Sequence, residues 1–188
     1  MSDFVNTVDV IGDEALADSI IDRSITEIAD NYATQIGRHA FLGCSQLIKV
    51  DFPMVLSIDD SAFCNCAKLT TVNFPLVTSI KSYAFEGCRA ITTADFPLVT
   101  SIGSSAFYKC SALTTLILRS GNTCTLSSVY GLADTTVASG TGYIYVPRAL
   151  VYTYKAATNW STYAAQFRAL EDYTVDGTIT GELDSTKI

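Results

Sequence analysis

A repeat of 22 residues constrains this chain more than any other feature of its sequence. The units begin at Ile36, Ile58, Ile80 and Ile102, and they follow one another without a gap as far as Thr123. In order, they read IGRHAFLGCSQLIKVDFPMVLS, IDDSAFCNCAKLTTVNFPLVTS, IKSYAFEGCRAITTADFPLVTS and IGSSAFYKCSALTTLILRSGNT. Self-similarity at such a period is typical of a solenoid, in which each unit buries its apolar face by stacking on its neighbours.

Columns that keep one residue type from unit to unit identify the core, because side chains that stack on their own copies must match in size. Later in each unit, apolar residues alternate with polar ones, as in Val50-Asp51-Phe52, which is typical of a strand with one buried face. A proline such as Pro53 follows, and proline is tolerated at a strand end. We therefore predict a solenoid with one short parallel strand per 22-residue coil. The columns are Ala40, Ala62, Ala84 and Ala106; Phe41, Phe63, Phe85 and Phe107; Cys44, Cys66, Cys88 and Cys110; and Leu47, Leu69, Ile91 and Leu113.

Both flanks depart from the repeat, and we expect them to cap the open ends of the solenoid. Residues 1–35 hold eight acidic groups against one basic group, and we interpret them as an acidic N-terminal segment, a polar cap and a half-repeat that includes Ile25 and Ile28. The four repeats occupy 36–123, and a fifth, degenerate repeat with a helical C-terminal cap occupies 124–172.

The C-terminal part carries two segments with helical spacing of apolar residues. These segments are 150–157 and 163–170, and Ser161 between them is a candidate N-cap. Residues 173–188 form a polar tail with an Asp-Gly turn signal, so a hairpin and a loose tail both stay open.

The cysteines and the single histidine are the residues that could have catalytic or metal-binding roles. The four column cysteines are expected to be buried thiols, because stacked copies lie farther apart than a disulfide prefers. Cys64 shares a column with Leu42 and Glu86, so we expect it to be exposed and open to oxidation. His39, the only histidine, is interpreted as a solvated loop residue. We expect no catalytic residue, no metal site and no cofactor.

Composition argues against two further classes of protein, nucleic-acid-binding proteins and membrane-spanning proteins. Nineteen acidic against twelve basic residues give a formal net charge of −7, which does not supply the phosphate-neutralising surface of a nucleic-acid-binding protein. No stretch approaches the roughly 18 apolar residues of a membrane span, and residues 1–20 lack the pattern of a signal peptide. We expect no nucleic-acid partner, no membrane insertion and no signal peptide in this chain.

The outward side of the strands is the candidate binding surface. Its polar side chains form two rows, each crossing the sheet one coil at a time, and tyrosines end both rows. Hydroxyls and amides at coil intervals can bind an extended peptide or glycan, and tyrosines dominate binding hot spots. The alternative is that Thr suits a solvated strand face and that the tyrosines pack beneath the C-terminal helices. The candidate ligand-binding residues are Lys49, Asp51, Thr71, Asn73, Thr93, Asp95, Thr115, Tyr143 and Tyr145.

Residues that vary between units form a second candidate surface on the opposite or lateral side of the coils, because stacking does not need them. They are His39, Tyr83, Arg89 and Tyr108.

The unit with Ile, then Ala-Phe, then Cys, then Leu-x-x-Val-x-Phe-Pro resembles the BspA-type leucine-rich repeat, found mostly in surface proteins of anaerobic bacteria and some protists. The resemblance covers roughly residues 20–172. The flanks 19–27, 119–127 and 142–177 are also similar to versions carried by phages and prophages of intestinal bacteria. The resemblance implies a leucine-rich-repeat solenoid with an extracellular or virion-borne recognition role, and it brings no catalytic residues.

We therefore expect a non-catalytic recognition module that binds a protein or a cell-surface glycan, as a phage tail or surface attachment component. It would be located on a virion or at the cell surface. The alternative is a structural or assembly component of a virion or surface particle, which docks through its N-terminal segment or its tail. The ligand and the oligomeric state stay open.

Overall fold

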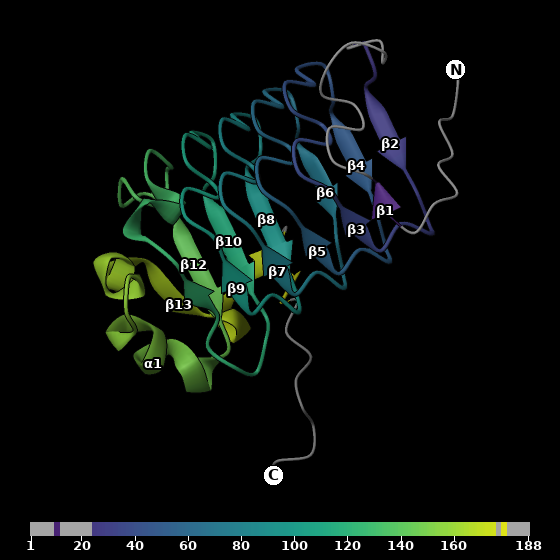
Figure 1. The fold of residues 1–188 in the computed structure, drawn as a ribbon. Helices are drawn as coiled ribbons and strands as arrows, with labels where there is room; N and C mark the ends of the chain where they lie inside the picture. Colours follow the sequence, from purple (N-terminus) through teal and green to yellow (C-terminus); the bar gives the residue numbers. More distant parts are fainter. Residues whose placement is uncertain (1–9, 12–23, 176–177, 180–188) are drawn as a thin grey trace.

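The computed structural model describes residues 10–11, 24–175 and 178–179 and shows a stack of coils along one axis (Figure 1). Each coil runs through two short strands on opposite sides of a core, and the strands of successive coils pair in parallel. This arrangement confirms the predicted solenoid.

The strand that the alternating pattern predicts is present in every coil. It pairs with its copy in the next coil, as Val50 does with Val72 and Ala94 with Leu116. These strands form one sheet in the order β2-β4-β6 and another in the order β13-β12-β10-β8. Their bounds are β2 (Glu27–Ala29), β4 (Lys49–Asp51), β6 (Thr71–Asn73), β8 (Thr93–Phe96), β10 (Thr115–Leu118), β12 (Tyr143–Val146) and β13 (Phe167–Ala169).

A second strand in each coil completes the fold and was not predicted. It has two residues and ends at the leading Ile column, so it is too short to show an alternating pattern in the sequence. The second strands form a six-stranded parallel sheet in the order β1-β3-β5-β7-β9-β11. Their bounds are β1 (Val10–Ile11), β3 (Gln35–Ile36), β5 (Ser57–Ile58), β7 (Ser79–Ile80), β9 (Ser101–Ile102) and β11 (Thr125–Leu126).

Two columns of buried phenylalanine rings fill the core of the coils. Rings of the first column stack with centroid distances of 4.9, 5.3 and 5.4 Å and with planes within 7° of parallel. Rings of the second column lie 5.7 and 6.4 Å apart. The columns consist of Phe41, Phe63, Phe85 and Phe107, and of Phe52, Phe74 and Phe96.

The outward ladder is interrupted once. Among the described strands, β6 and β8 do not pair with each other, and each is the edge of its own sheet. The 6.4 Å separation of Phe74 and Phe96 lies at the same junction. Here Ala94 stands where other coils have Val or Leu, and Val72 is only half-buried. Pairing of β7 with β9 holds these two coils together on the other side.

A carboxylate ends the second phenylalanine column at its N-terminal side. Asp30 stands one period before Phe52 and is buried. Its Oδ1 accepts hydrogen bonds from the backbone N–H groups of Tyr32 (2.7 Å) and Ala33 (2.9 Å), which closes an Asx turn. This turn occupies the position that a phenylalanine ring takes in the following coils. Ile28 pairs with Val50, as expected for the predicted half-repeat.

The C-terminal cap is a cluster of large aromatic side chains. The rings of Tyr154, Trp160 and Phe167 lie 5.3–5.8 Å from one another. Trp160 Nε1 donates to the carbonyl of Cys124, and Tyr154 Oη accepts from the N–H of Cys124. Asn159 Nδ2 donates to the carbonyl of Leu126. The cap thereby satisfies polar backbone groups at β11, the last strand of its sheet.

Parts of the predicted cap are wrong in detail. The α-helix α1 covers Val151–Ala156, but the predicted second helix is a 3-10 segment, η3 (Trp160–Gln166), followed by strand β13. Phe167 is therefore a strand residue, because its backbone adds to the parallel sheet beside β12. Asn159, not Ser161, is the N-cap of η3. The other 3-10 segments are η1 (Val129–Leu132), η2 (Arg148–Leu150) and η4 (Leu170–Asp172).

The tail begins as a hairpin, one of the two forms left open by the sequence. Strand β14 (Thr174–Val175) pairs antiparallel with β15 (Thr178–Ile179). The Asp-Gly turn signal at 176–177 lies outside the described residues.

One prediction concerns backbone conformation in the coils. A Cβ atom added to Gly43 or to Gly121 would meet no atom within 4 Å, but only Gly43 has a positive φ, of 71°. We expect Gly43→Ala to lower the free energy of unfolding by about 1 kcal/mol, since an L-residue strains this conformation. Gly121→Ala is the matched control and should leave it unchanged or raise it by up to about 1 kcal/mol. Urea denaturation measures both, and equal effects would refute the backbone explanation.

Candidate functional site

The strand face, meaning the outward side chains of β4, β6, β8, β10 and β12, gathers the candidate binding residues. Lys49 lies beside Thr71 and Asp51 beside Asn73 in the first sheet. The second sheet brings Thr93, Thr115 and Tyr143 side by side in one row, and Asp95, Ile117 and Tyr145 in the other. The interrupted ladder divides the face into two halves.

The N-terminal half of the strand face is polar and solvated. Lys49, Thr71 and Asn73 are exposed, and Asp51 is half-buried. Asn73 Nδ2 donates to Asp51 Oδ1 at 2.7 Å, so these two side chains satisfy each other. This half offers a hydrophilic surface with little apolar area.

The C-terminal half is organised around an ion pair. Arg119 Nε lies 3.0 Å from Asp95 Oδ1, and Arg119 Nη2 lies 2.7 Å from Asp95 Oδ2. These hydrogen bonds raise the pKa of the Arg119 guanidinium and hold it as a rigid fork. The pair fixes Arg119 between β8 and β10.

Aromatic side chains lie on the neighbouring strand β12 and in the segment after η4. The rings of Tyr143 and Tyr145 lie 6.3 Å apart, and the Tyr145 ring lies 4.7 Å from the ring of Tyr173, which follows η4. Arg168 of β13 places its guanidinium carbon 4.5 Å from the centroid of Tyr143. Partial burial raises the pKa of Tyr145, and the neighbouring Tyr143 and Tyr173 raise it further.

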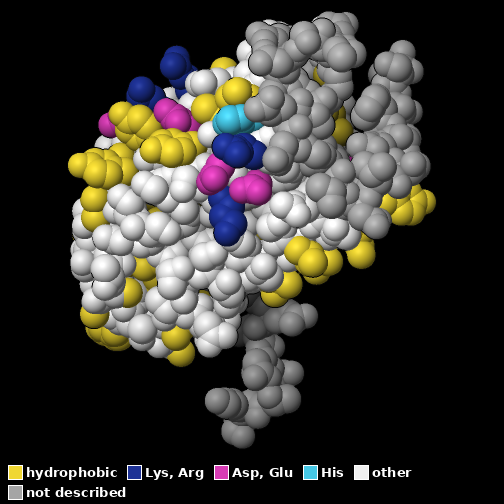
Figure 2. All heavy atoms as spheres, viewed as in Figure 1, with side chains coloured by type: hydrophobic (Ala, Val, Ile, Leu, Met, Phe, Trp, Pro, Cys, Tyr) yellow, Lys and Arg dark blue, Asp and Glu magenta, His cyan; other side chains and the backbone are white. Residues whose placement is uncertain are grey.

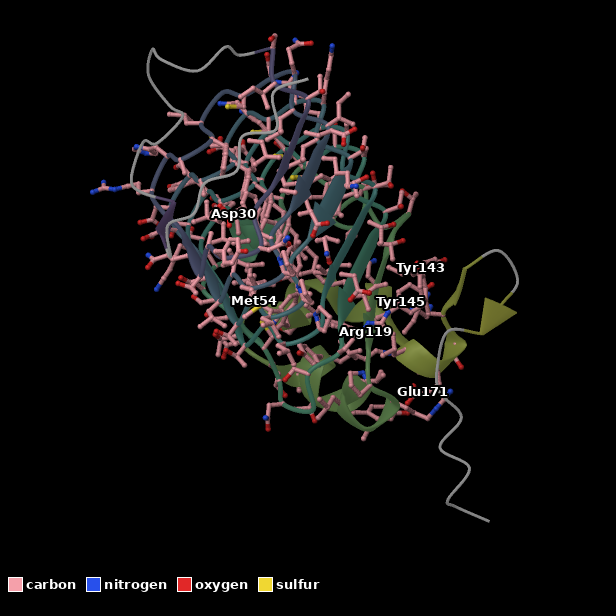
Figure 3. The ribbon with its side chains drawn as sticks, turned by 90° about the vertical axis from the view of Figure 1, so that its right-hand side faces the viewer. Asp30, Met54, Arg119, Tyr143, Tyr145 and Glu171 are labelled. Atoms are coloured by element: carbon pink, nitrogen blue, oxygen red, sulfur yellow. The ribbon has the colours of Figure 1, made fainter. Side chains whose placement is uncertain are left out.

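Two features of this half bear on the sequence predictions, namely the alternative that the tyrosines pack beneath the C-terminal helices and the polar character of the outward rows. Tyr143 is 40% exposed, and the ring partners of the two strand tyrosines are each other, Arg168 and Tyr173, not residues of α1. Ile117, in an outward row, is only 1% exposed. Figure 3 shows Tyr143, Tyr145 and Arg119 along one side of the stack, facing the hairpin of β14 and β15.

A second surface is apolar. The turns that follow β2, β4, β6 and β8 carry Tyr32, Met54, Leu76 and Leu98 at the same column, and three of these are 45–60% exposed. The turn segments 31–36, 53–58, 75–80 and 97–102 contain no charged residue. Figure 2 shows hydrophobic side chains in a row along its lower right margin, where Figure 1 places these turns. We call this row the turn ridge.

Comparison with known proteins identifies the family. The model of the BspA type leucine rich repeat region matches residues 34–135 with six copies. The chain belongs to the BspA-type leucine-rich repeat family. No curated protein matches it.

Solved structures show the same fold. A leucine-rich repeat protein of Treponema pallidum superposes with a TM-score of 0.57 and 21% identity, covering 66% of this chain and 59% of that one. A leucine rich cell surface protein of Faecalibacterium prausnitzii gives 0.56 and 21%, covering 86% and 43%. A leucine-rich repeat protein of Bacteroides ovatus gives 0.55 and 22%, covering 77% and 36%. The chain thus spans less than two thirds of the length of each of these proteins.

Sequence reasoning missed three residues of this BspA-type repeat protein that shape the strand face. Arg119 stands where the earlier units have proline, and this departure from the repeat was the available signal. Arg168 and Tyr173 lie beyond the last unit, where no period identifies partners. The predicted second surface is less uniform: Tyr83 and Arg89 are exposed, whereas His39 and Tyr108 are half-buried.

The cysteine column is structural. Cys66, Cys88 and Cys110 donate their Sγ protons to carbonyls in the preceding coil, at 3.0–3.1 Å. Burial raises the pKa of Cys110 to about 12 and that of Cys88 well above its usual range. Cys88 and Cys110 therefore stay protonated, and the three thiol hydrogen bonds join successive coils.

Cys64 corrects one expectation, because it is 7% exposed, not an open surface thiol. Its Sγ lies 4.0 Å from Glu86 Oε2 and accepts from Asn65 Nδ2 at 3.4 Å. Burial first, and then the Glu86 carboxylate, raise the pKa of Cys64 to about 11.

The described residues contain neither a candidate metal-binding cluster nor a candidate membrane-spanning helix. Nowhere in 24–175 do three His, Cys, Asp or Glu side chains gather in a group that could hold a metal ion. None of the helices in this part of the chain is long and apolar enough to cross a bilayer.

The Cys64 environment gives a prediction about reactivity. At pH 8, iodoacetamide should modify Cys64 of the native protein at least about tenfold more slowly than a small cysteine peptide, because the thiolate is the nucleophile. Peptide mapping by mass spectrometry follows the modified site, and Cys64→Ser provides the blank. Modification of Cys64 at the rate of the reference peptide would contradict its burial.

Proposed function

We propose that this chain is a non-catalytic module that binds another protein through the C-terminal half of its strand face. The observation that carries this proposal is the cluster of Tyr143, Tyr145, Arg119 and Arg168 on a rigid parallel sheet. Tyrosine and arginine are the residue types most enriched in binding hot spots.

Rigidity supports the proposal. The strands beneath these side chains rest on buried columns, including Ile144, Leu116 and Ala94, which are 0% exposed. Fixed tyrosines lose little conformational entropy on binding, so their contact area is used efficiently. The paired guanidinium of Arg119 likewise does not need to be ordered.

The partner class follows from the charges. In this half of the face, Asp95 neutralises Arg119, and Arg168 lies over the Tyr143 ring, so the surface combines aromatic area with little net charge. Such a surface suits a protein segment better than a nucleic acid, which needs unbalanced positive charge. A cell-surface glycan is the other ligand class that we predicted.

We further propose a location at a cell surface. The structural neighbour from Faecalibacterium prausnitzii is described as a leucine rich cell surface protein, and this chain has leucine-rich repeats of the BspA type. The phage-tail location is the competing proposal, and immunogold labelling of producing cells and of virions distinguishes them.

The binding proposal is tested by substituting Tyr143 and Arg168. Binders selected from a displayed peptide library should lose at least about tenfold in affinity with Tyr143→Ala or Arg168→Ala, as expected for hot-spot residues. Tyr152→Ala is the matched control, because Tyr152 is 84% exposed and lies on α1, and it should change affinity by less than about twofold. Affinities unaffected by the face variants would reject this surface, and binding only on a glycan array would reject the protein partner.

The turn ridge favours a second candidate function, assembly. It is uncharged, whereas the chain has a net charge of −7, so it is the face through which two copies meet with least repulsion. The N-terminal segment and the tail, the two docking elements predicted for an assembly component, lie largely outside the described residues.

Sedimentation velocity tests the assembly function. Under this alternative the protein self-associates reversibly, and Met54→Lys with Leu98→Lys shifts the association constant at least about tenfold towards monomer, because each buries a charge at an apolar contact. A Tyr152→Lys control should leave it unchanged. A protein that stays monomeric at high concentration would exclude self-assembly through the ridge.

A further inference from the structure

The segment that follows η4 returns to the strand face. Arg148 Nη2 pairs with Asp172 Oδ1 at 2.7 Å, and the backbone N–H of Arg148 faces the Glu171 carboxylate at 3.2 and 3.4 Å. These contacts lie beside the end of β12 and place the next residue, Tyr173, against Tyr145. The chain thereby lays one of its own aromatic side chains on the candidate surface.

The place that Tyr173 occupies has the features of a small binding site. Ile117 lies beside Tyr145 in the strand register and is 1% exposed, so it forms an apolar floor in an outward row that is polar in the earlier coils. Arg119, two residues further on, is held by Asp95, and the Tyr173 hydroxyl lies near enough to contribute to the raised pKa of that guanidinium. Tyr145 forms the aromatic wall of this site, and its ring centroid lies 4.7 Å from that of Tyr173.

The equivalent positions in earlier coils cannot form this site. Where the last unit has Ile117 and Arg119, the first three have Asp or Asn followed by proline, for example Asp95 and Pro97. The apolar floor and the cationic fork therefore occur together at one coil, next to the tyrosines of β12.

We infer that Ile117, Arg119 and Tyr145 form a docking subsite for the aromatic side chain of an extended peptide, and that Tyr173 fills it in cis. This inference rests on the proposed function and names the ligand chemistry that the strand face takes. A tyrosine of the partner would pack its ring against Tyr145 at a tilted angle, as Tyr173 does. It would then lie next to Ile117, the register neighbour of Tyr145, and near Arg119.

The cis occupant is held weakly enough to be displaced. Its ion pair to Arg148 is more than half exposed on both sides, at 62% and 57%, and such pairs contribute little stability. Strands β14 and β15 form a two-stranded sheet that joins none of the other described sheets, and isolated hairpins are marginally stable. A partner therefore competes with a tethered residue of modest effective concentration.

If a partner must displace Tyr173, removing Tyr173 strengthens the binding of a separate peptide. The apparent affinity equals the intrinsic affinity multiplied by the fraction of molecules whose subsite is open. The probe is the acetylated and amidated peptide Asp-Tyr-Thr-Val, which copies residues 172–175. Its binding is followed by the δ1-methyl signal of Ile117 in isoleucine-labelled protein, a group that a ring directly overhead shifts. The variants are Tyr173→Ala and a chain that ends at Asp172, with Tyr152→Ala as the matched control.

We expect the peptide to shift the Ile117 methyl signal saturably in Tyr173→Ala and in the shortened chain, with an apparent affinity at least about tenfold higher than in the unaltered chain or in Tyr152→Ala. The peptide Asp-Ala-Thr-Val should give no saturable shift. Equal affinity for all four proteins, or no shift of Ile117 in Tyr173→Ala, would overturn the subsite.

Failure of the subsite and failure of the proposed function are distinguishable. If Tyr143→Ala abolishes binding of selected partners but the tyrosine peptide leaves Ile117 unmoved, the recognition face stands and the subsite is wrong. If the peptide binds at Ile117 but Tyr143→Ala and Arg168→Ala leave the affinity for selected partners unchanged, the proposed function is wrong and the subsite stands.

Discussion

Stacking of identical apolar side chains at the spacing of parallel strands is the interaction on which the rest of this structure depends. The rings of Phe63 and Phe85, 5.3 Å apart and nearly parallel, are separated by about the distance that β-pairing imposes on the backbone. Ring stacking and strand pairing therefore reinforce each other in every coil. Where the stack widens, between Phe74 and Phe96, the outward ladder also opens.

The same constraint leaves the outward side chains free to differ, because they are not needed for stacking. Regular units produce regular surfaces, such as the Asp51–Asn73 pair, which satisfy their own hydrogen bonds. The concentrated cluster of aromatic and cationic groups arises only where the repeat breaks, at Arg119 and in β12. The candidate site is thus a product of the transition from repeat to cap.

Period and alternation in the sequence predicted the coils, the core columns and the outward strands, since these depend on residues that recur every 22 positions. Features set by single contacts were not predictable. The two-residue strands are too short for a pattern, and Phe167 has helical spacing although backbone pairing with β12 makes it a strand residue. Cys64 sits in a variable column, but its neighbours Asn65 and Glu86 close over it.

The C-terminal cap links stability to recognition. Trp160 and Tyr154 satisfy the backbone of Cys124 and so end the six-stranded sheet next to β11. Strand β13 of the same segment extends the outward sheet and brings Arg168 over Tyr143. A cap that only covered apolar columns would need the aromatic cluster but not the cation on the exposed tyrosine. Because one segment supplies both, the C-terminal end of the solenoid is capped by the same segment that holds aromatic and cationic side chains rigidly at the surface.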